Sequence, residues 1–445
     1  MLFAVIAAFF GLFMAVIVPP FQTPDELAHY YRAYDIADFK WIAQKTALGM
    51  GDELPQSLYR IAEELTDEIP FHPQQKISVQ KIITYLSIPL NETVKTFVPF
   101  PTAALTSPVV YIPQAMGMAM GKALHLPPLI FLYLGRVFNL IAWMTLVFFA
   151  IRITPIGKWL FCLLALLPMS VFLAASLSAD PVTNGLSFLL IACVLKEALM
   201  DRGSPLRTPN LIAILILLAL ISLTKQAYLF TPFLFLLIPV KRLKNTRRYL
   251  TLFVGLVSVF FLTGSLWFFA VSKIYVPYQA GVSPGDQLHY ILDHPLTYFM
   301  TIIQTLIAHG FYIRSFIGNL GWLDTPLPLG IYLSYPIFLL ASSLYDDPNR
   351  RFLTIKQRAW LLLLFVFGSM LIFTMLFLSW EPVGSKSIPG VQGRYFFPIA
   401  PLFFLVFQRG FQRKSGYPWK NKVFAVYAIA CLTCSVYVLM MRYYI

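Results

Sequence analysis

Long apolar runs with almost no charged residues recur along the whole chain. A helix needs about 20 mostly apolar residues to cross a lipid bilayer. Repeated runs approaching this length are not expected in a water-soluble protein. Eleven such runs occur, at residues 1–18, 129–151, 158–175, 181–200, 209–224, 227–240, 250–271, 327–344, 359–379, 395–408 and 423–441. The sequence therefore predicts an all-α, polytopic transmembrane protein with about 11 spans.

The composition excludes a water-soluble fold. Hydrophobic residues make up 58% of the 445 residues and charged residues only 12%, whereas soluble domains are about a quarter charged. The 40 Phe and 23 Tyr residues are typical of lipid-facing surfaces and of interfacial aromatic belts. We expect a single transmembrane domain over residues 1–445.

The net charge of +14 comes from basic residues whose distribution along the chain indicates the membrane topology. Of the 34 Lys and Arg residues, 19 lie in five short loops between apolar runs, at 152–158, 196–207, 241–248, 350–358 and 409–422. Basic residues gather in the cytoplasmic loops of membrane proteins. This distribution favours a membrane-lipid environment and argues against a nucleic-acid partner.

With the basic loops in the cytoplasm, the other loops face outward. Residues 20–104 form the first extracytoplasmic loop, which holds 11 of the 20 acidic residues, and residues 272–326 form the second. Residues 105–122 contain two prolines and several Met and Gly residues, and a crossing there would put the next basic loop outside. We therefore predict an interfacial or re-entrant helix at 105–122.

Two further expectations follow from the same topology. Within the first loop, apolar residues at spacings of three and four predict amphipathic helices at 25–39 and 54–68. Residues 296–317 are expected to form a helix on the outer side rather than a span, and the C-terminus is expected outside.

The segment after the first apolar run reads P-P-F-Q-T-P-D-E-L-A-H-Y-Y-R. Asp25 and Glu26 are explained by helix capping and the helix dipole alone, because Pro24 suits the first helical position and acids suit the first turn. A functional interpretation notes that His29 and Arg32 follow at one and two helical turns from Asp25. Carboxylate, imidazole and guanidinium would then share one face at the membrane surface.

The other outward turns carry matching polar residues, and one cation lies inside a predicted span. A cation within the bilayer costs about 2.5–3.5 kcal/mol and normally has an anionic partner. Protein carboxylates are one such partner, and a lipid phosphate at the outer surface is another. The candidates are Arg136, Asp180, Asn184, Lys225, Tyr228, Trp322, Asp324, Gln392 and Arg394.

Such a cluster suits the transfer of a sugar from a polyprenyl phosphate. The phosphate is a good leaving group, so one carboxylate that deprotonates the acceptor hydroxyl and cations that stabilise the phosphate are sufficient. The histidines do not cluster, and no spacing indicates a dedicated metal site. A divalent ion on Asp25 and Glu26 stays an open alternative.

Four motifs in order resemble a known family: P-P-F-Q-T-P-D-E-L-A-H-Y-Y-R-A-Y, S-A-D-P-x-x-N, G-W-L-D and G-V-Q-G-R-Y-F-F-P. They are similar to a bacterial domain-of-unknown-function family of predicted integral membrane proteins in the GT-C glycosyltransferase superfamily. The resemblance covers roughly residues 15–405, with no large C-terminal soluble domain.

The resemblance implies an inverting hexosyl or pentosyl transfer from a polyprenyl-phosphate sugar to a glycan, lipid or protein acceptor. It places the protein in the bacterial cytoplasmic membrane, with its site facing the periplasm or exterior. It also implies Asp25 as the catalytic base and Glu26 as its partner or metal contact. From position alone, we assign His29, Arg32, Arg136, Lys225, Gln392 and Arg394 to the donor phosphate.

Two other classes of function remain open. A polymerase or ligase of lipid-linked glycans would use a similar cation cluster but favours a very long late outward loop, and the 272–326 loop is moderate in length. A transporter or flippase of lipid-linked saccharides would place charges near the middle of several spans. Here the span interiors are almost free of charge and polar residues gather at one rim, which favours the transferase.

Overall fold

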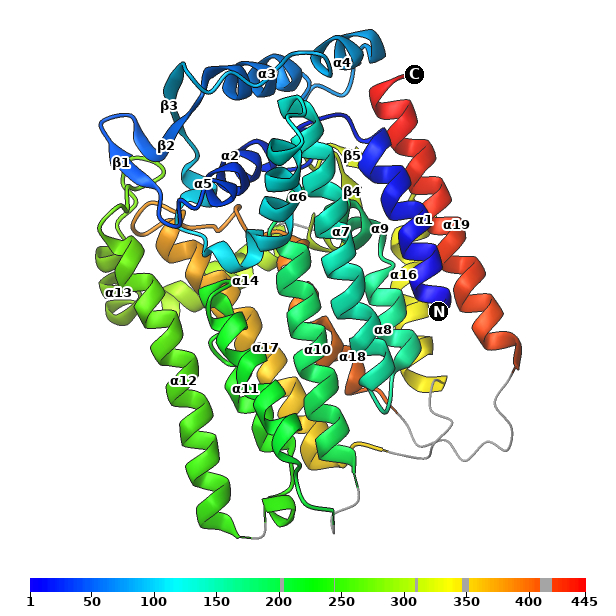
Figure 1. Ribbon diagram of the computed structural model, residues 1–445. Coiled ribbons are helices and arrows are strands. Elements are labelled where there is room, and N and C mark those ends of the chain that lie inside the picture. The colour runs from blue at the N-terminus through cyan, green and yellow to red at the C-terminus, as the bar shows by residue number, and fades with distance from the viewer. Residues whose placement is uncertain (201–203, 244, 309–310, 346–351, 409–417) are drawn as a thin grey trace.

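The computed structural model describes residues 1–200, 204–243, 245–308, 311–345, 352–408 and 418–445. A bundle of helices runs the length of the molecule, and a layer of short helices and strands covers one end of it (Figure 1). Among the described residues, five helices are long and apolar enough to cross a membrane: α7 (Pro128–Ile153), α10 (Asp180–Leu199), α12 (Thr246–Ser272), α17 (Ile355–Ser379) and α19 (Pro418–Tyr443).

Several other predicted spans are short or broken. Helices α1 (Leu2–Ile17), α11 (Thr208–Ser222) and α16 (Leu329–Tyr345) are shorter apolar helices. The run at 158–175 is split into α8 (Lys158–Ala165) and α9 (Pro168–Ala174), because Pro168 lacks the N–H that would continue the first helix. The count of eleven spans stays a prediction.

Prolines also break the runs at 227–240 and 395–408. The first run contains the 3₁₀ helices η2 (Gln226–Tyr228) and η3 (Thr231–Leu237), and η4 (Val240–Leu243) follows. The second contains η5 (Gly393–Ile399) and α18 (Ala400–Leu405). Both breaks lie beside the polar residues that the sequence singles out, so irregular backbone and polar side chains occur at the same places.

The layer at the end of the bundle is built mainly from the first predicted loop. Helices α2 (Glu26–Ala37) and α3 (Gln56–Thr66) lie where the apolar spacing predicts helices, and α4 (Val79–Tyr85) and α5 (Pro101–Ala104) follow. One face of α3 is buried through Leu58, Ile61, Ala62 and Leu65. The loop therefore packs on the bundle as an amphipathic cover.

A three-stranded antiparallel sheet within this layer was not expected from the sequence. Its strands are β1 (Gln44–Thr46), β2 (Gly49–Pro55) and β3 (Lys95–Pro99), with β2 in the centre and Gly51 opposite Pro99. The central strand reads G-M-G-D-E-L-P, which has no β-branched or aromatic residue. Its register is set by a partner far along the chain.

The segment at 105–122 forms η1 (Pro108–Tyr111) and α6 (Ile112–Ala123). A 12-residue helix is about 18 Å long, which is short against a hydrocarbon core of about 30 Å. In Figure 1, α6 lies beside the end of α7 that is nearest to the covering layer. The interfacial or re-entrant placement of residues 105–122 stays a prediction.

The second predicted loop contains α13 (Pro284–Asp293), α14 (Pro295–Ala308), α15 (Phe311–Ile317) and the strands β4 (Asn319–Leu320) and β5 (Thr325–Pro326). Helices α14 and α15 are bent by 65° relative to one another and would add a sixth crossing if they form one span. Their position on the outer side stays a prediction.

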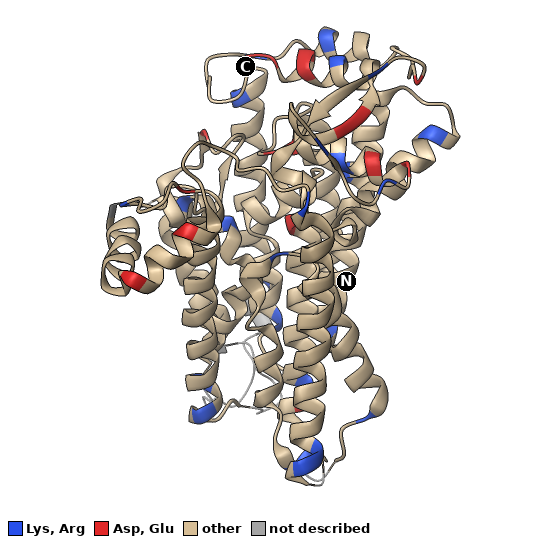
Figure 2. Ribbon diagram, turned by 90° about the vertical axis from the view of Figure 1, so that its left-hand side faces the viewer, with Lys and Arg blue, Asp and Glu red and all other residues tan. Residues whose placement is uncertain are grey.

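Charge is distributed unequally between the two ends of the bundle. Lys and Arg residues lie at both ends of the molecule, whereas almost all Asp and Glu residues lie in or near the covering layer, so the opposite end is the basic end (Figure 2). The C-terminus lies at the covered end (Figure 1). The charge bias predicts that the covered end faces outward and the basic end faces the cytoplasm, and this orientation stays a prediction.

Candidate active site

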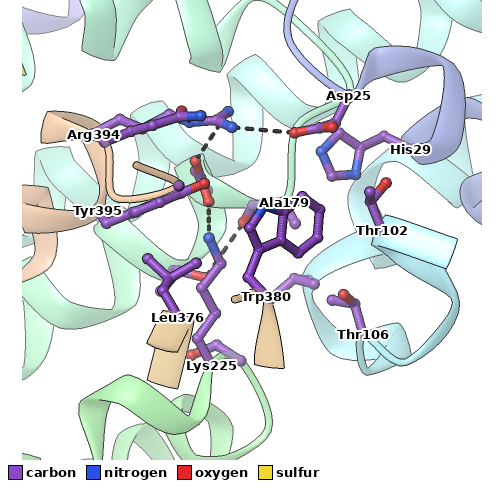
Figure 3. A pocket seen from close by; sticks show the side chains of 16 residues that line it. Asp25, His29, Thr102, Thr106, Ala179, Lys225, Leu376, Trp380, Arg394 and Tyr395 are labelled. Carbon is purple, nitrogen blue, oxygen red and sulfur yellow. Dashed lines mark hydrogen bonds and ion pairs between the residues drawn. The ribbon is translucent and has the colours of Figure 1, made fainter. Parts of the chain in front are cut away.

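A polar cavity lies where the covering layer meets the bundle. It has a volume of about 210 Å³, and its polar lining includes Asp25, His29, Asp180, Lys225, Gln392 and Arg394. These residues come from the start of α2, the start of α10, the break after α11 and the segment that enters η5. The structure thus gathers six of the sequence-derived candidates, from four distant segments, around one space (Figure 3).

Two cations and two carboxylates form a connected network in this cavity. The Lys225 ammonium lies 2.6 Å from Asp180 Oδ1. The Arg394 guanidinium lies 3.6 Å from Asp180 Oδ2 and 3.2 Å from Asp25 Oδ2. Asp180 therefore bridges both cations and partly neutralises them. Figure 3 marks the contact between Arg394 and Asp25 with a dashed line.

Arg394 is almost fully buried, with a side-chain exposure of 3%, and its neighbours hold it in place. Its Nε donates to Gln392 Oε1 at 2.6 Å. The Tyr395 ring lies under both cations, 4.8 Å from the Lys225 ammonium and 5.3 Å from the Arg394 guanidinium. Pairing and stacking of this kind offset part of the cost of burying a cation.

Asp25 differs from Asp180 in its exposure and its backbone. Its side chain is 36% exposed, against 9% for Asp180. Asp25 is the residue before α2 and has a left-handed backbone, with φ 61° and ψ 8°. A non-glycine residue in this region is strained, and such strain concentrates at functional sites. Among the described residues, Arg394 is the one whose side chain forms a hydrogen bond and ion pair with its carboxylate.

His29 enters the cavity from the next turn of α2. Its Nδ1 lies 2.6 Å from the Tyr111 hydroxyl. Burial lowers the pKa of His29 to about 4, and the nearby carboxylates of Asp25 and Asp180 only partly oppose this shift. The imidazole is therefore neutral near pH 7, so it can hydrogen-bond to a substrate but adds no positive charge for a phosphate.

Glu26 and Arg136 lie outside the cavity and bind each other. Both side chains are fully buried, and Arg136 Nε and Nη2 donate to the two Glu26 oxygens at 2.8 and 2.6 Å. Arg136 also donates to the carbonyls of Ala15, Val18 and Pro19. With all its donors used inside the protein, this pair fastens α1, α2 and α7 together and offers nothing to a donor phosphate.

Arg32 is also used internally. It is buried, with its Nη2 donating to the Trp41 carbonyl at 2.6 Å and its Nη1 3.8 Å from Asp35. Arg32 follows His29 by three residues on α2, but its guanidinium is bound by the carbonyls of Lys40 and Trp41 in the loop after the helix. The Arg32 guanidinium therefore does not line the cavity.

The remaining candidates lie around the cavity or away from it. Asn184 is buried within α10, and Tyr228 donates to the Tyr395 carbonyl at 3.1 Å. Trp322 Nε1 donates to the Phe21 carbonyl, and Asp324 accepts from Arg442 at 3.0 Å. These contacts connect distant chain segments, and the four side chains do not line the cavity.

The structure also brings in residues that the sequence did not single out. Thr102, Thr106, Trp380 and Tyr395 line the cavity. Trp380 comes directly after α17, where a tryptophan is ordinarily explained as part of an interfacial belt. The threonines lie in a segment without periodicity, so no sequence signal pointed to them.

An apolar groove adjoins the cavity. It shares Thr102, Thr224, Lys225, Leu376 and Tyr395 with the cavity, and its own lining includes Leu223, Ala227, Trp267, Ile372 and Met375. These residues come from the break after α11 and from α12 and α17. Only four of the 27 residues of α12 are buried inside the protein: Tyr249, Leu256, Phe260 and Val271. The groove thus leads from the cations toward the lipid-facing side of the bundle.

The structure does not support a metal shared by Asp25 and Glu26. Both Glu26 oxygens accept from Arg136, and Glu26 Oε1 also accepts from the Leu177 amide at 3.1 Å. Across the part of the chain that the structure describes, no group of three or more His, Cys, Asp or Glu side chains is placed to hold a metal ion.

The fold and the cavity define a polytopic helical membrane protein with a cation–carboxylate site at one end of its bundle. A family model described as a predicted membrane protein, DUF2142, matches residues 8–403. The chain therefore belongs to the DUF2142 family of predicted membrane proteins. A search of curated proteins found no match.

Two solved structures of ArnT from Cupriavidus metallidurans are similar to the chain at 14% identity and a TM-score of 0.44. For the apo structure the match covers 94% of this chain and 61% of ArnT. For the structure bound to undecaprenyl phosphate it covers 99% and 74%. The chain thus spans about three fifths of the ArnT chain in the apo comparison.

Proposed function

We propose that the protein is a GT-C-type glycosyltransferase of the cell envelope. It transfers a sugar from a polyprenyl-phosphate donor to a glycan, lipid or protein acceptor on the extracytoplasmic face of the cytoplasmic membrane, with inversion at the anomeric carbon. One observation carries the proposal: the partly exposed carboxylate of Asp25 shares a cavity with Lys225 and Arg394.

Asp25 acts as the general base in this mechanism. Its carboxylate takes the proton of the acceptor hydroxyl while that oxygen forms a bond to the anomeric carbon. The bond between this carbon and the phosphate oxygen breaks at the same time, and the phosphate leaves with the electron pair. No general acid is required, because the leaving group is a phosphate.

Lys225 and Arg394 stabilise the charge that develops on the departing phosphate. In the structure both cations are bound to Asp180, so the donor phosphate has to exchange with this carboxylate. Lys225 is the better placed for exchange, because its side chain is 36% exposed whereas that of Arg394 is 3% exposed. Arg394 in turn orients Asp25 through their 3.2 Å contact.

The apolar groove supports a donor that carries a lipid chain. It begins at Lys225 and Tyr395 and is lined by side chains of α12 and α17. A polyprenyl chain can lie along it while the phosphate stays at Lys225. A soluble sugar nucleotide would have no use for such a groove.

The test is Asp25→Asn, compared with Asp286→Asn as a matched control on the exposed start of α13. Membranes containing equal amounts of each variant receive a panel of undecaprenyl-phosphate-linked hexoses and pentoses, and transfer is followed by loss of the lipid-linked sugar. Removing the base should lower transfer by about 10²- to 10⁴-fold, with Asp286→Asn unchanged.

In the native host, the same substitution should remove one envelope glycan modification and cause its lipid-linked donor to accumulate. If Asp25→Asn transfers sugar at the wild-type rate, the Asp25 carboxylate is not the base and the proposed mechanism is wrong. Transport of a lipid-linked saccharide, without sugar transfer, would then be the favoured function.

A further inference from the structure

The indole of Trp380 occupies a special position in the cavity. Trp380 follows the last residue of α17 and lines the cavity together with His29, Thr102 and Thr106. In Figure 3 its ring lies between the Lys225 side chain and these three residues. The ring thus lies beside the cavity that Asp25, Lys225 and Arg394 also line, where a transferred sugar has to lie.

One face of this ring is covered by Tyr278. The two rings are stacked, with centroids 4.2 Å apart and planes inclined by 15°. The segment that carries Tyr278 also binds the backbone, because Gln279 Nε2 donates to the Trp380 carbonyl at 2.6 Å. The second loop therefore fixes the indole from one side, while Trp380 also lines the cavity.

The edge of the ring is fixed by Gly390. A Cβ at this position would lie 2.9 Å from Cδ1 of Trp380, closer than side-chain carbons normally approach. The absence of a side chain at Gly390 lets the loop before η5 pack directly against the ring edge. The indole is consequently held on one face and one edge, and its Nε1 donates to none of the described residues.

A fixed aromatic face beside hydroxyl and imidazole groups matches the chemistry of a sugar ring. The C–H groups on one face of a sugar pack on an aromatic ring, and the hydroxyl groups at its rim hydrogen-bond to polar side chains. A tryptophan of the interfacial belt would instead present its ring to lipid headgroups. Trp380 is stacked on Tyr278 and turned into the cavity, so the belt does not account for it.

We infer that Trp380, backed by Tyr278, is the platform on which a sugar ring lies in the site. The inference rests on the proposed glycosyl transfer and names the feature that recognises the sugar. The sugar ring on this platform belongs either to the donor or to a saccharide acceptor, since both must approach Asp25.

The experiment uses the full chain in detergent with Trp380→Leu and Trp380→Phe. Trp41→Leu is the control, because this indole lies in the covering layer, is 49% exposed and does not line the cavity. Binding of undecaprenyl phosphate is compared with binding of the undecaprenyl-phosphate-linked sugars. Loss of the platform should weaken binding of the sugar-linked lipid by about tenfold and leave the bare lipid unaffected, whereas Trp380→Phe should retain most of the affinity.

The same variants distinguish the two sources of the sugar. Weaker binding of the sugar-linked lipid assigns the platform to the donor. Unchanged donor binding with a raised KM for a saccharide acceptor assigns it to the acceptor. Equal weakening of bare and sugar-linked lipid, or no change in donor binding and acceptor KM, overturns the inference.

Failure of the platform can be told apart from failure of the proposed function. If the wild type transfers sugar and Trp380→Leu binds and transfers as the wild type does, only the platform is wrong. If the wild type transfers no sugar and binds the sugar-linked lipid no better than undecaprenyl phosphate, the transferase proposal falls and the platform falls with it.

Discussion

Asp25 and Glu26 are neighbours with different environments. Asp25 has a left-handed backbone and places a partly exposed carboxylate in the cavity. Glu26 begins α2 and places its carboxylate on Arg136, away from solvent. The sequence presents them as one acidic pair, but local backbone geometry separates a candidate base from a structural anchor.

The buried pair should matter for stability. Breaking a buried ion pair by removing one partner leaves an uncompensated charge and costs about 3–5 kcal/mol. We therefore expect Glu26→Gln to lower the melting temperature of the purified protein strongly, whereas Asp25→Asn should change it little. Thermal unfolding in detergent measures both, and equal melting temperatures for Glu26→Gln and wild type would contradict the structural assignment.

His29 predicts a pH dependence of stability. Its pKa is about 4 in the folded protein, against 6.5 ordinarily, so the unfolded chain binds an extra proton between these values. The stabilising effect of the neutral imidazole is therefore complete above pH 6.5 and is lost as the pH falls toward 4, by about 3 kcal/mol in total.

The comparison for this prediction is His29→Gln, which keeps a hydrogen-bonding group but does not titrate. Its melting temperature should fall less between pH 7 and pH 5 than that of the wild type. Parallel curves for the two proteins would show that His29 is not buried in neutral form.

At the scale of elements, the approach of η5 to α15 decides where Arg394 lies. A Cβ on Gly393 would overlap the Tyr312 carbonyl and the Phe316 amide, and the Gly393 amide donates to the Ser315 hydroxyl at 2.8 Å. The two backbones therefore meet without an intervening side chain, and Arg394 follows directly.

We expect Gly393→Ala to push η5 away from α15 and to displace Arg394. A shift of about 1 Å in a positioned group can cost about 10²-fold in rate, so transfer should fall to that extent. Gly330→Ala is the control, since a Cβ there meets nothing within 4 Å. Wild-type transfer by Gly393→Ala would show that the close approach is not required.

The apolar periodicity of the first loop predicted α2 and α3, but it did not predict the sheet formed by β1, β2 and β3. Helices α2 and α3 carry local apolar spacing that can be read in the sequence, whereas β2 pairs with β3 across the whole of α3 and α4. The broken spans have readable causes in Pro168, Pro232 and Pro398. How the resulting pieces pack is not a local property.

The orientation in the membrane is a prediction for the whole molecule. It is tested with single cysteines in a chain whose four native cysteines are replaced, at Leu48, which is 69% exposed in the covering layer, and at Arg248, which is exposed at the basic end. A membrane-impermeant maleimide should label position 48 in intact cells and position 248 only after permeabilisation. The reverse pattern would place the cavity on the cytoplasmic side and rule out an extracytoplasmic transfer.

Hydropathy and charge by themselves determined the membrane class, the all-α architecture and the expected outward face, because these follow from the cost of placing polar groups in lipid. The sequence also named Asp25, Asp180, Lys225 and Arg394. Only the tertiary structure decided that these four form one network while Arg136 and Glu26 form another. A buried cation takes whichever anion the packing of distant segments brings within reach, and that distance is not encoded in spacing along the chain.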